Sequence, residues 1–343
     1  MSVTRLLPFW ISMLMPVVAA MAIAWGGWWV LSVPVLIFGL IPVLDAACGH
    51  ERGNPIEGTP PRAGLRPDLS LWAWVPTQVV MIGAAVARAP AMTPGERWGT
   101  AVAVGLVAGA GGINVAHELM HRRSALARGA AELLMSSVGY PHFCVEHVHG
   151  HHRHVATPLD PASAERGLSL YRFWGRTLVG SLRSAWRIEA RRRRERGGTP
   201  WSDRRIRMAV VMLWAWGLAH WLGGTAGLVL FVTQGVVAVL LLETINYVEH
   251  YGLRRARLPD GRYERVQPRH SWNASQRLTN WFLFNLQRHS DHHYLASRPY
   301  WALRHYPEVP QLPFGYATAV LVALLPPLWR RIMDPRVDHW MQD

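Results

Sequence analysis

Residues 98–121 read WGTAVAVGLVAGAGGINVAHELMH, an apolar run that ends in a pair of histidines. The stretch 98–116 carries no charged side chain and is long enough to cross the roughly 30 Å hydrocarbon core of a bilayer as a helix. The pair that follows, His117 and His121, is spaced by four residues, so both imidazoles lie on one face of a helix. The stretch therefore predicts a membrane-spanning helix that presents two candidate metal ligands at one end.

Five more apolar runs of similar character occur in the chain. These five runs predict spans near 7–25, 28–44, 69–87, 208–222 and 225–245. Together with 98–116 they make six predicted spans. A later run, 316–329, is shorter and contains Pro326–Pro327, which indicates an interfacial or re-entrant helix. We expect an all-α integral membrane protein, a single domain over 1–343 with six transmembrane helices and a cytoplasmic, helical, histidine-rich cap.

The distribution of charge predicts how the protein is oriented. The formal net charge of +14 comes from arginine alone, because the sequence has no lysine. With a cytoplasmic N-terminus, the three outer loops hold almost no arginine, and most of it falls in the cytoplasmic segments, chiefly 117–207 and 247–343. This pattern favours a bacterial-type inner membrane, with both termini and the histidines cytoplasmic. It disfavours nucleic acid as the partner of the basic residues, and the run Arg191–Arg194 fits a surface that faces lipid or a partner protein.

Cysteine and the N-terminus are consistent with that location. Cys48 and Cys144 are the only cysteines, and two cannot form a disulfide framework or a zinc ribbon. The first apolar run is followed at once by a second, which indicates a retained helix rather than a signal peptide.

Four groups of histidines carry the chemistry. The HExxH string at 117–121 also occurs in zinc proteases, so it does not define the reaction alone. Further along come His147, His151 and His152, then His250, and then His289, His292 and His293. Spacings of three to five residues place the members of each group largely on one helical face. His149 and His154 would point elsewhere on a regular helix and are expected to be solvated or to support the ligands. The histidines that fit no such spacing are expected to be ordinary residues; they are His50, His142, His220, His270, His305 and His339.

So many imidazoles exceed what one metal ion can coordinate, which predicts two ions. The absence of cysteine from the groups disfavours zinc–thiolate, blue-copper and iron–sulfur sites. Imidazole suits iron, copper and zinc alike, so spacing does not choose among them.

Longer strings resemble the membrane-bound alkane 1-monooxygenases. These are HELMH at 117–121, EHVHGHHRHVATPLDPAS at 146–163, NYVEHYGL at 246–253, HSWNASQRLTNWFLFNLQRHSDHH at 270–293 and LPFGY at 312–316. Three histidine boxes, HxxxH at 117–121, HxxxHH at 147–152 and HxxHH at 289–293, indicate on their own only the wider superfamily of integral-membrane desaturases and hydroxylases. The string at 246–253 and the long string at 270–293 are more specific to the hydrocarbon hydroxylases.

The resemblance implies a non-haem diiron centre held by nine histidines. They are His117, His121, His147, His151, His152, His250, His289, His292 and His293. It places Asp160 and Asp291 where carboxylates can orient ligand imidazoles, with Glu118 and Glu146 as weaker candidates. Ile37 falls where medium-chain members carry a bulky aromatic that limits the substrate tunnel; the alternative is that Ile37 faces lipid.

The implied reaction is terminal hydroxylation of an n-alkane or related hydrocarbon: RH + O₂ + two electrons + two protons gives ROH + H₂O. The chain has no Cys-x-x-Cys pair for a fused rubredoxin, so electrons are expected from a separate rubredoxin or ferredoxin with its reductase. The alternatives are a xylene-type aromatic-methyl hydroxylase and an acyl-lipid desaturase or hydroxylase. A metal transporter is a remote alternative, because it would need ionisable residues within the spans.

Overall fold

The computed structural model describes residues 6–55, 65–197, 199 and 202–342, and those residues contain helices and isolated β-bridges but no strand. The all-α prediction is therefore confirmed for them. The α-helices are α1 (Leu14–Trp25), α2 (Ser32–Pro34), α3 (Ile41–Cys48), α4 (Leu65–Arg88), α5 (Pro94–Val107), α6 (Asn114–Met120), α7 (Ala125–Ser137), α8 (Phe143–Glu146), α9 (His152–His154), α10 (Leu170–Arg196), α11 (Arg204–His250), α12 (Arg277–Phe282), α13 (His289–Tyr294), α14 (Tyr316–Ala323) and α15 (Pro326–Trp340).

Short 3₁₀ and π-helical segments extend or join these helices. The 3₁₀ segments are η2 (Leu7–Met13), η3 (Gly27–Leu31), η5 (Ala89–Ala91), η9 (Pro268–His270) and η10 (Tyr300–Ala302). The π-helical segments are η4 (Val35–Leu40), η6 (Ala108–Ile113) and η7 (His147–His151).

Five continuous helical stretches are long and apolar enough to cross a membrane. Four of them, Leu7–Trp25, Gly27–Cys48, Asp68–Ala91 and Pro94–Met120, coincide closely with the first four predicted spans. The agreement has a simple cause, since bilayer thickness sets the length of an apolar run and charged or turn-forming residues end it.

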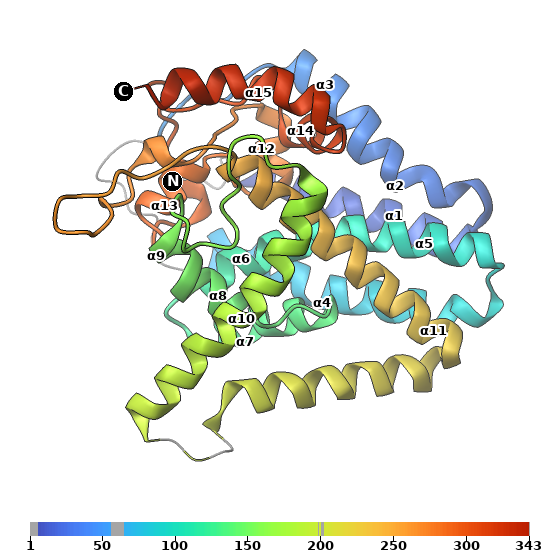
Figure 1. Cartoon of the computed structure of the whole chain (residues 1–343). Helices are drawn as coiled ribbons and strands as arrows, with labels where there is room; N and C mark the ends of the chain where they lie inside the picture. The colour runs from blue at the N-terminus through green and yellow to red at the C-terminus, as the bar shows by residue number, and fades with distance from the viewer. Residues whose placement is uncertain (1–5, 56–64, 198, 200–201, 343) are drawn as a thin grey trace.

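The fifth stretch, α11, contains both remaining predicted spans. At about 1.5 Å per residue its 47 residues would extend about 70 Å if straight, more than twice the thickness of the hydrocarbon core. It is not straight, because Gly224 has φ +57° and ψ −157° and breaks the helix. Figure 1 shows the two arms of α11 diverging from a sharp bend, one along the edge of the molecule and the other through its middle.

Close packing of α5 against the second arm of α11 forms the centre of the bundle. A Cβ on Gly105 would stand 2.5 Å from the carbonyl oxygen of Gln234, and one on Gly109 would stand 3.1 Å from the backbone of Ala238. Any larger side chain at Gly105 would force the two helices apart, as is usual where small residues allow close helix contact in membranes.

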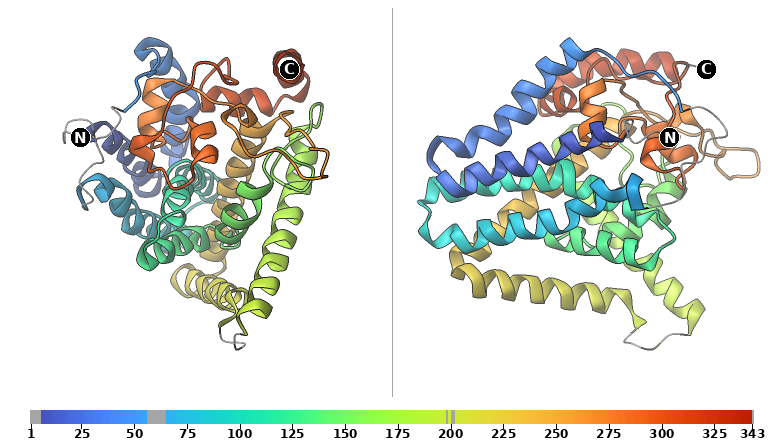
Figure 2. Two further views of the ribbon diagram at one scale, coloured as in Figure 1. Left: turned by 90° about the vertical axis from the view of Figure 1, so that its left-hand side faces the viewer. Right: turned by 180° about the vertical axis from the view of Figure 1, so that it is seen from behind.

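The histidine-bearing elements gather at one end of the long helices. Figure 1 shows α9 and α13 at the end opposite the turn between α1 and α2 and the bend within α11, and Figure 2 shows the same arrangement from two other sides. The predicted interfacial run 316–329 forms the end-to-end pair α14 and α15, which is broken before Pro326 and packs over the same end. This end therefore brings together residues that lie as much as 176 positions apart, from His117 to His293.

Candidate metal centre

The first pair of histidines is positioned by the α5–η6–α6 helix. His117 lies on α6, and His121 is the residue at which this helix ends. Their ring centroids are 5.4 Å apart, and His117 is buried. The one-turn spacing thus places both rings in the same part of the cap, as the sequence predicts.

The second group lies on a π-helical turn, which changes the pairing expected from an α-helix. In η7 the hydrogen bonds run over five residues rather than four, so side chains at i and i+5 come together. Accordingly Nε2 of His147 lies 3.0 Å from Nε2 of His152. His151, which an α-helix would place beside His147, points its Nε2 instead to that of His293 at 3.2 Å.

The remaining histidines come from the end of α11 and from α13. His250 is the last residue of α11 and is fully buried. Its Nε2 lies 3.1 Å from that of His289, which lies 2.9 Å from that of His293. His292, one residue before His293, points to the other side, with its Nε2 3.0 Å from that of His152.

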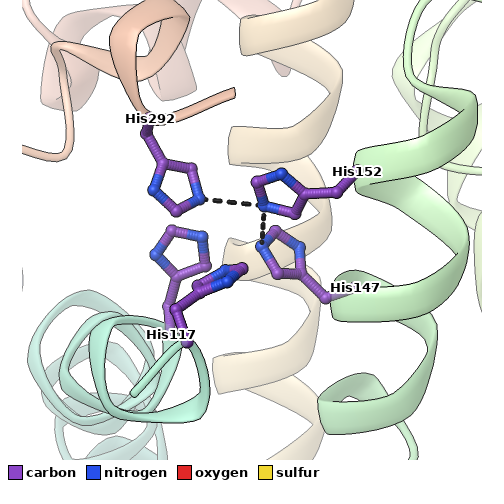
Figure 3. Close-up of side chains that lie close together, drawn as sticks. His117, His147, His152 and His292 are labelled. Atoms are coloured by element: carbon purple, nitrogen blue, oxygen red, sulfur yellow. Dashed lines mark hydrogen bonds between the residues drawn. The ribbon is translucent and has the colours of Figure 1, made fainter. Parts of the chain in front are cut away.

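Nine histidines therefore form two groups, in each of which one nitrogen per ring lies within 4.8 Å of all the others. The five-histidine group contains His117, His121, His147, His152 and His292, and the four-histidine group contains His151, His250, His289 and His293. Figure 3 shows four rings of the five-histidine group turned toward a common centre. Every histidine that the sequence predicts as a ligand belongs to one of these groups, and His149, His154 and the six histidines without spacing belong to neither.

Metal ions satisfy these nitrogens better than hydrogen bonds within the groups can. A neutral imidazole has one donor nitrogen and one acceptor nitrogen, so a ring of converging Nε2 atoms cannot pair fully. Among the rings of the two groups, His121 has a buried Nε2 with no hydrogen-bond partner in the described structure. A metal ion at each centre would accept the lone pairs of all the converging nitrogens at once, so the residues present fit two ions.

Burial keeps most of these imidazoles neutral, as ligation requires. It lowers the pKa of His147, His152, His289, His292 and His293 well below the ordinary value, and the neighbouring imidazoles lower it further. The pKa of His121 falls to about 3 for the same reasons. In His151 burial also acts to lower the pKa, but the hydrogen bond with Asp160 and the charges of Asp160, Glu146 and Glu249 together raise it.

Asp160 is the predicted carboxylate that contacts a ligand ring. Its Oδ2 lies 2.8 Å from Nδ1 of His151 and accepts a hydrogen bond from Ser163 Oγ at 2.6 Å. Held in this way, His151 carries its proton on Nδ1 and turns a bare Nε2 toward the four-histidine group.

The other predicted carboxylates have different surroundings. Asp291 binds Arg298, the backbone N–H of Arg304 and the Tyr306 hydroxyl, and no imidazole is among its contacts in the described structure. It therefore ties α13 to the following loop. Glu118 pairs with Arg122 at 2.7 Å. Glu146 is buried and its Oε1 has no hydrogen-bond partner in the described structure.

A mostly apolar cavity is bounded at one place by histidines of both groups. His117 and His147 of the five-histidine group and His289 of the four-histidine group form part of its wall. The rest of the wall is mostly aliphatic and aromatic. Side chains from the predicted spans make up much of it: Met15, Ile37, Phe38, Ile41, Ala110, Ile113, Leu241, Leu242 and Ile245. Phe282, Leu283 and Leu286, from α12 and the segment after it, also contribute. Ile37 is buried in this wall, so it does not face lipid.

Glu249 also lines this cavity and was not predicted as a site residue. Its Oε2 lies 3.1 Å from Nε2 of His289, and its Oε1 accepts a hydrogen bond from the Tyr316 hydroxyl at 2.7 Å. Its position directly before His250 in the string NYVEHYGL was the available signal, but an acidic residue beside a histidine is commonly a solvated group.

Known proteins resemble this chain over most of its length. The fatty acid desaturase family profile matches residues 97–320. Alkane 1-monooxygenase 1 of Pseudomonas aeruginosa is 44% identical over 320 residues, covering 90% of this chain and 83% of that protein. Alkane 1-monooxygenase 2 of the same organism is 45% identical, covering 92% and 84%. The xylene/toluene monooxygenase hydroxylase component of Pseudomonas putida is 30% identical, covering 96% and 89%.

Proposed function

The chain belongs to the alkane 1-monooxygenase family, and on that premise we propose that it hydroxylates the terminal carbon of n-alkanes with two iron ions held by its nine clustered histidines. The observation that carries the proposal is the cavity, whose wall is mostly apolar and includes histidines of both groups. An alkane has no polar group to bind, so its recognition requires such an apolar channel. The higher identity to alkane 1-monooxygenases than to the xylene/toluene enzyme supports an alkane over an alkyl-aromatic substrate.

The residues of the chain have separate tasks in this reaction. Two bound irons would supply the reduction of O₂ and the oxidant that inserts an oxygen atom into the terminal C–H bond. The cavity wall orients the alkane so that its terminal carbon reaches His117, His147 and His289. The same wall keeps water away from the reacting carbon. Asp160 holds the proton of His151 on Nδ1, so that Nε2 remains available for a metal.

We further propose that both arms of α11 cross the membrane, which gives six spans with the histidine end in the cytoplasm. The arms on either side of Gly224 are about 30 and 39 Å long at 1.5 Å per residue, enough for one crossing each. The concentration of arginine in the segments that carry the cap supports this orientation and a bacterial inner membrane. A separate rubredoxin or ferredoxin would then dock on this basic side, where complementary charge speeds association.

A host-cell assay tests the function. Wild type, His289→Ala and His142→Ala are expressed with a rubredoxin and its reductase, and the cells are given n-alkanes of graded length. His142 is a suitable control because it is a buried histidine outside both groups. We expect 1-alkanol from the wild type and from His142→Ala and none from His289→Ala. Iron-loaded wild type that makes no alkanol, but oxidises xylene or an acyl lipid, would refute the alkane assignment.

A further inference from the structure

The carboxylate of Glu249 is held with one oxygen fixed and the other directed at the four-histidine group. The side chain lies on the last turn of α11 and is buried. Tyr316 from α14 donates its hydroxyl hydrogen bond to Oε1 at 2.7 Å. This leaves Oε2 free of other partners in the described structure except Nε2 of His289, 3.1 Å away.

The distance from Oε2 to His289 is the distance expected between two ligands of one metal ion. Imidazole nitrogens and carboxylate oxygens bind a divalent metal at about 2.0–2.2 Å, so two of them at right angles lie about 3 Å apart. Within the four-histidine group, the Nε2 atoms of His289 and His250 are 3.1 Å apart and those of His289 and His293 are 2.9 Å apart. Oε2 thus occupies the place of one more ligand beside His289.

The number of donors in the two groups points the same way. One group has five histidines and the other has four. We propose that Glu249 is the fifth donor of the four-histidine group, a refinement that rests on the proposed diiron function. A carboxylate beside imidazoles is a ligand set that suits iron.

The alternative is that Glu249 only accepts a hydrogen bond from His289. His289 would then carry its proton on Nε2, the nitrogen that faces His250 and His293, and would be lost as a ligand of that group. The buried carboxylate would also lack a cation, because no arginine pairs with it among the described residues. A metal ion at the group provides the balancing charge that an isolated buried carboxylate needs.

Iron content and Mössbauer spectra of the purified, ⁵⁷Fe-loaded protein test this assignment without relying on turnover. Glu249→Gln keeps the shape of the side chain and removes its charge. Glu243→Gln is the matched control, because Glu243 is a buried carboxylate on the same helix whose partners are Tyr140, Thr177 and Asn246 and no histidine. Tyr316→Phe leaves Glu249 in place but removes the hydrogen bond that orients it.

We expect two iron signals in the wild type and in Glu243→Gln. In Glu249→Gln one signal should be lost or changed and the other retained, with that ion bound at least about 10-fold more weakly. The retained signal shows that the variant is folded, and Tyr316→Phe should alter the same signal to a smaller degree.

Two results would overturn the assignment in different ways. Two unchanged signals in Glu249→Gln would show that Glu249 is not a ligand while leaving the diiron proposal intact. A wild type that binds fewer than two irons under conditions that load the family's other members would refute the proposed function, and this inference with it.

Discussion

Shortening Ile37 should extend the range of alkanes that the protein accepts. The side chain is buried in the cavity wall beside Phe38 and Ile41, so Ile37→Ala opens space inside the cavity rather than toward lipid. The substitution frees room for about three carbons, and each methylene that becomes buried contributes about 0.8 kcal/mol. At the length limit of the wild type, the preference for an alkane about three carbons longer should therefore rise by about 2.4 kcal/mol, or about 60-fold in the ratio of kcat/KM values.

Competition between two alkanes measures this ratio directly. One alkane is the longest that the wild type hydroxylates well and the other is about three carbons longer, and the two 1-alkanols are quantified from one culture. Leu40→Ala is the matched control, because it removes the same number of carbons from the same π-helical segment, but at a side chain that is 47% exposed. Ile37→Trp should have the opposite effect, since it fills the cavity. If Ile37→Ala and Leu40→Ala give the same product ratio as the wild type, Ile37 does not limit chain length.

Three further perturbations test the metal centre and its support. Asp160→Asn should weaken iron binding by about 10- to 100-fold, because the amide no longer fixes the proton of His151; wild-type iron retention against a competing chelator would contradict this. Chelation of the metal should lower the melting temperature and Fe(II) should restore it, since an ion at 1,000 times its Kd stabilises the fold by about 4 kcal/mol; an unchanged melting temperature on chelation would show that the histidine groups hold no stabilising ion. Asp203→Ala should lower the free energy of unfolding by about 1–2 kcal/mol and leave the iron content unchanged, because Asp203 caps the N-terminus of α11 through the N–H of Arg205. Asp203→Asn should lower it less. Equal melting temperatures for the wild type and both variants would argue against the cap.

The membrane helices could be predicted from the sequence because their cause is local. An apolar run of bilayer length needs no knowledge of its neighbours, and the first four spans agree closely with the helices in the structure. The fifth and sixth were separated at Gly223–Gly224, and the structure has its break at Gly224. A glycine there is needed for the positive φ angle.

The nine histidines could be predicted individually, but not how they divide. Spacing relates residues of one helix, whereas the two groups combine rings from four separate parts of the chain. The contacts of Asp291 and Glu249 could not be predicted from spacing for the same reason. Asp291 binds a loop that follows α13, and Glu249 meets its partners from α13 and α14 only after the cap is folded.

The π-helical segments explain both the division of the histidines and the shape of the cavity. On a regular α-helix, His147 and His151 would share a face, and His152 would be turned about 100° away from His151. The wider turn of η7 instead pairs His147 with His152 and frees His151 for the other group, so that one short segment supplies histidines to both groups. The two other π-helical segments also face the cavity, η4 through Ile37 and Phe38 and η6 through Ala110 and Ile113. A π-helical turn is less stable than an α-helical one and is retained mostly at functional sites. The presence of three such segments around one cavity, η4 and η6 in its wall and η7 through His147, indicates that the arrangement of the cavity and of the histidine groups takes precedence over regular helix geometry.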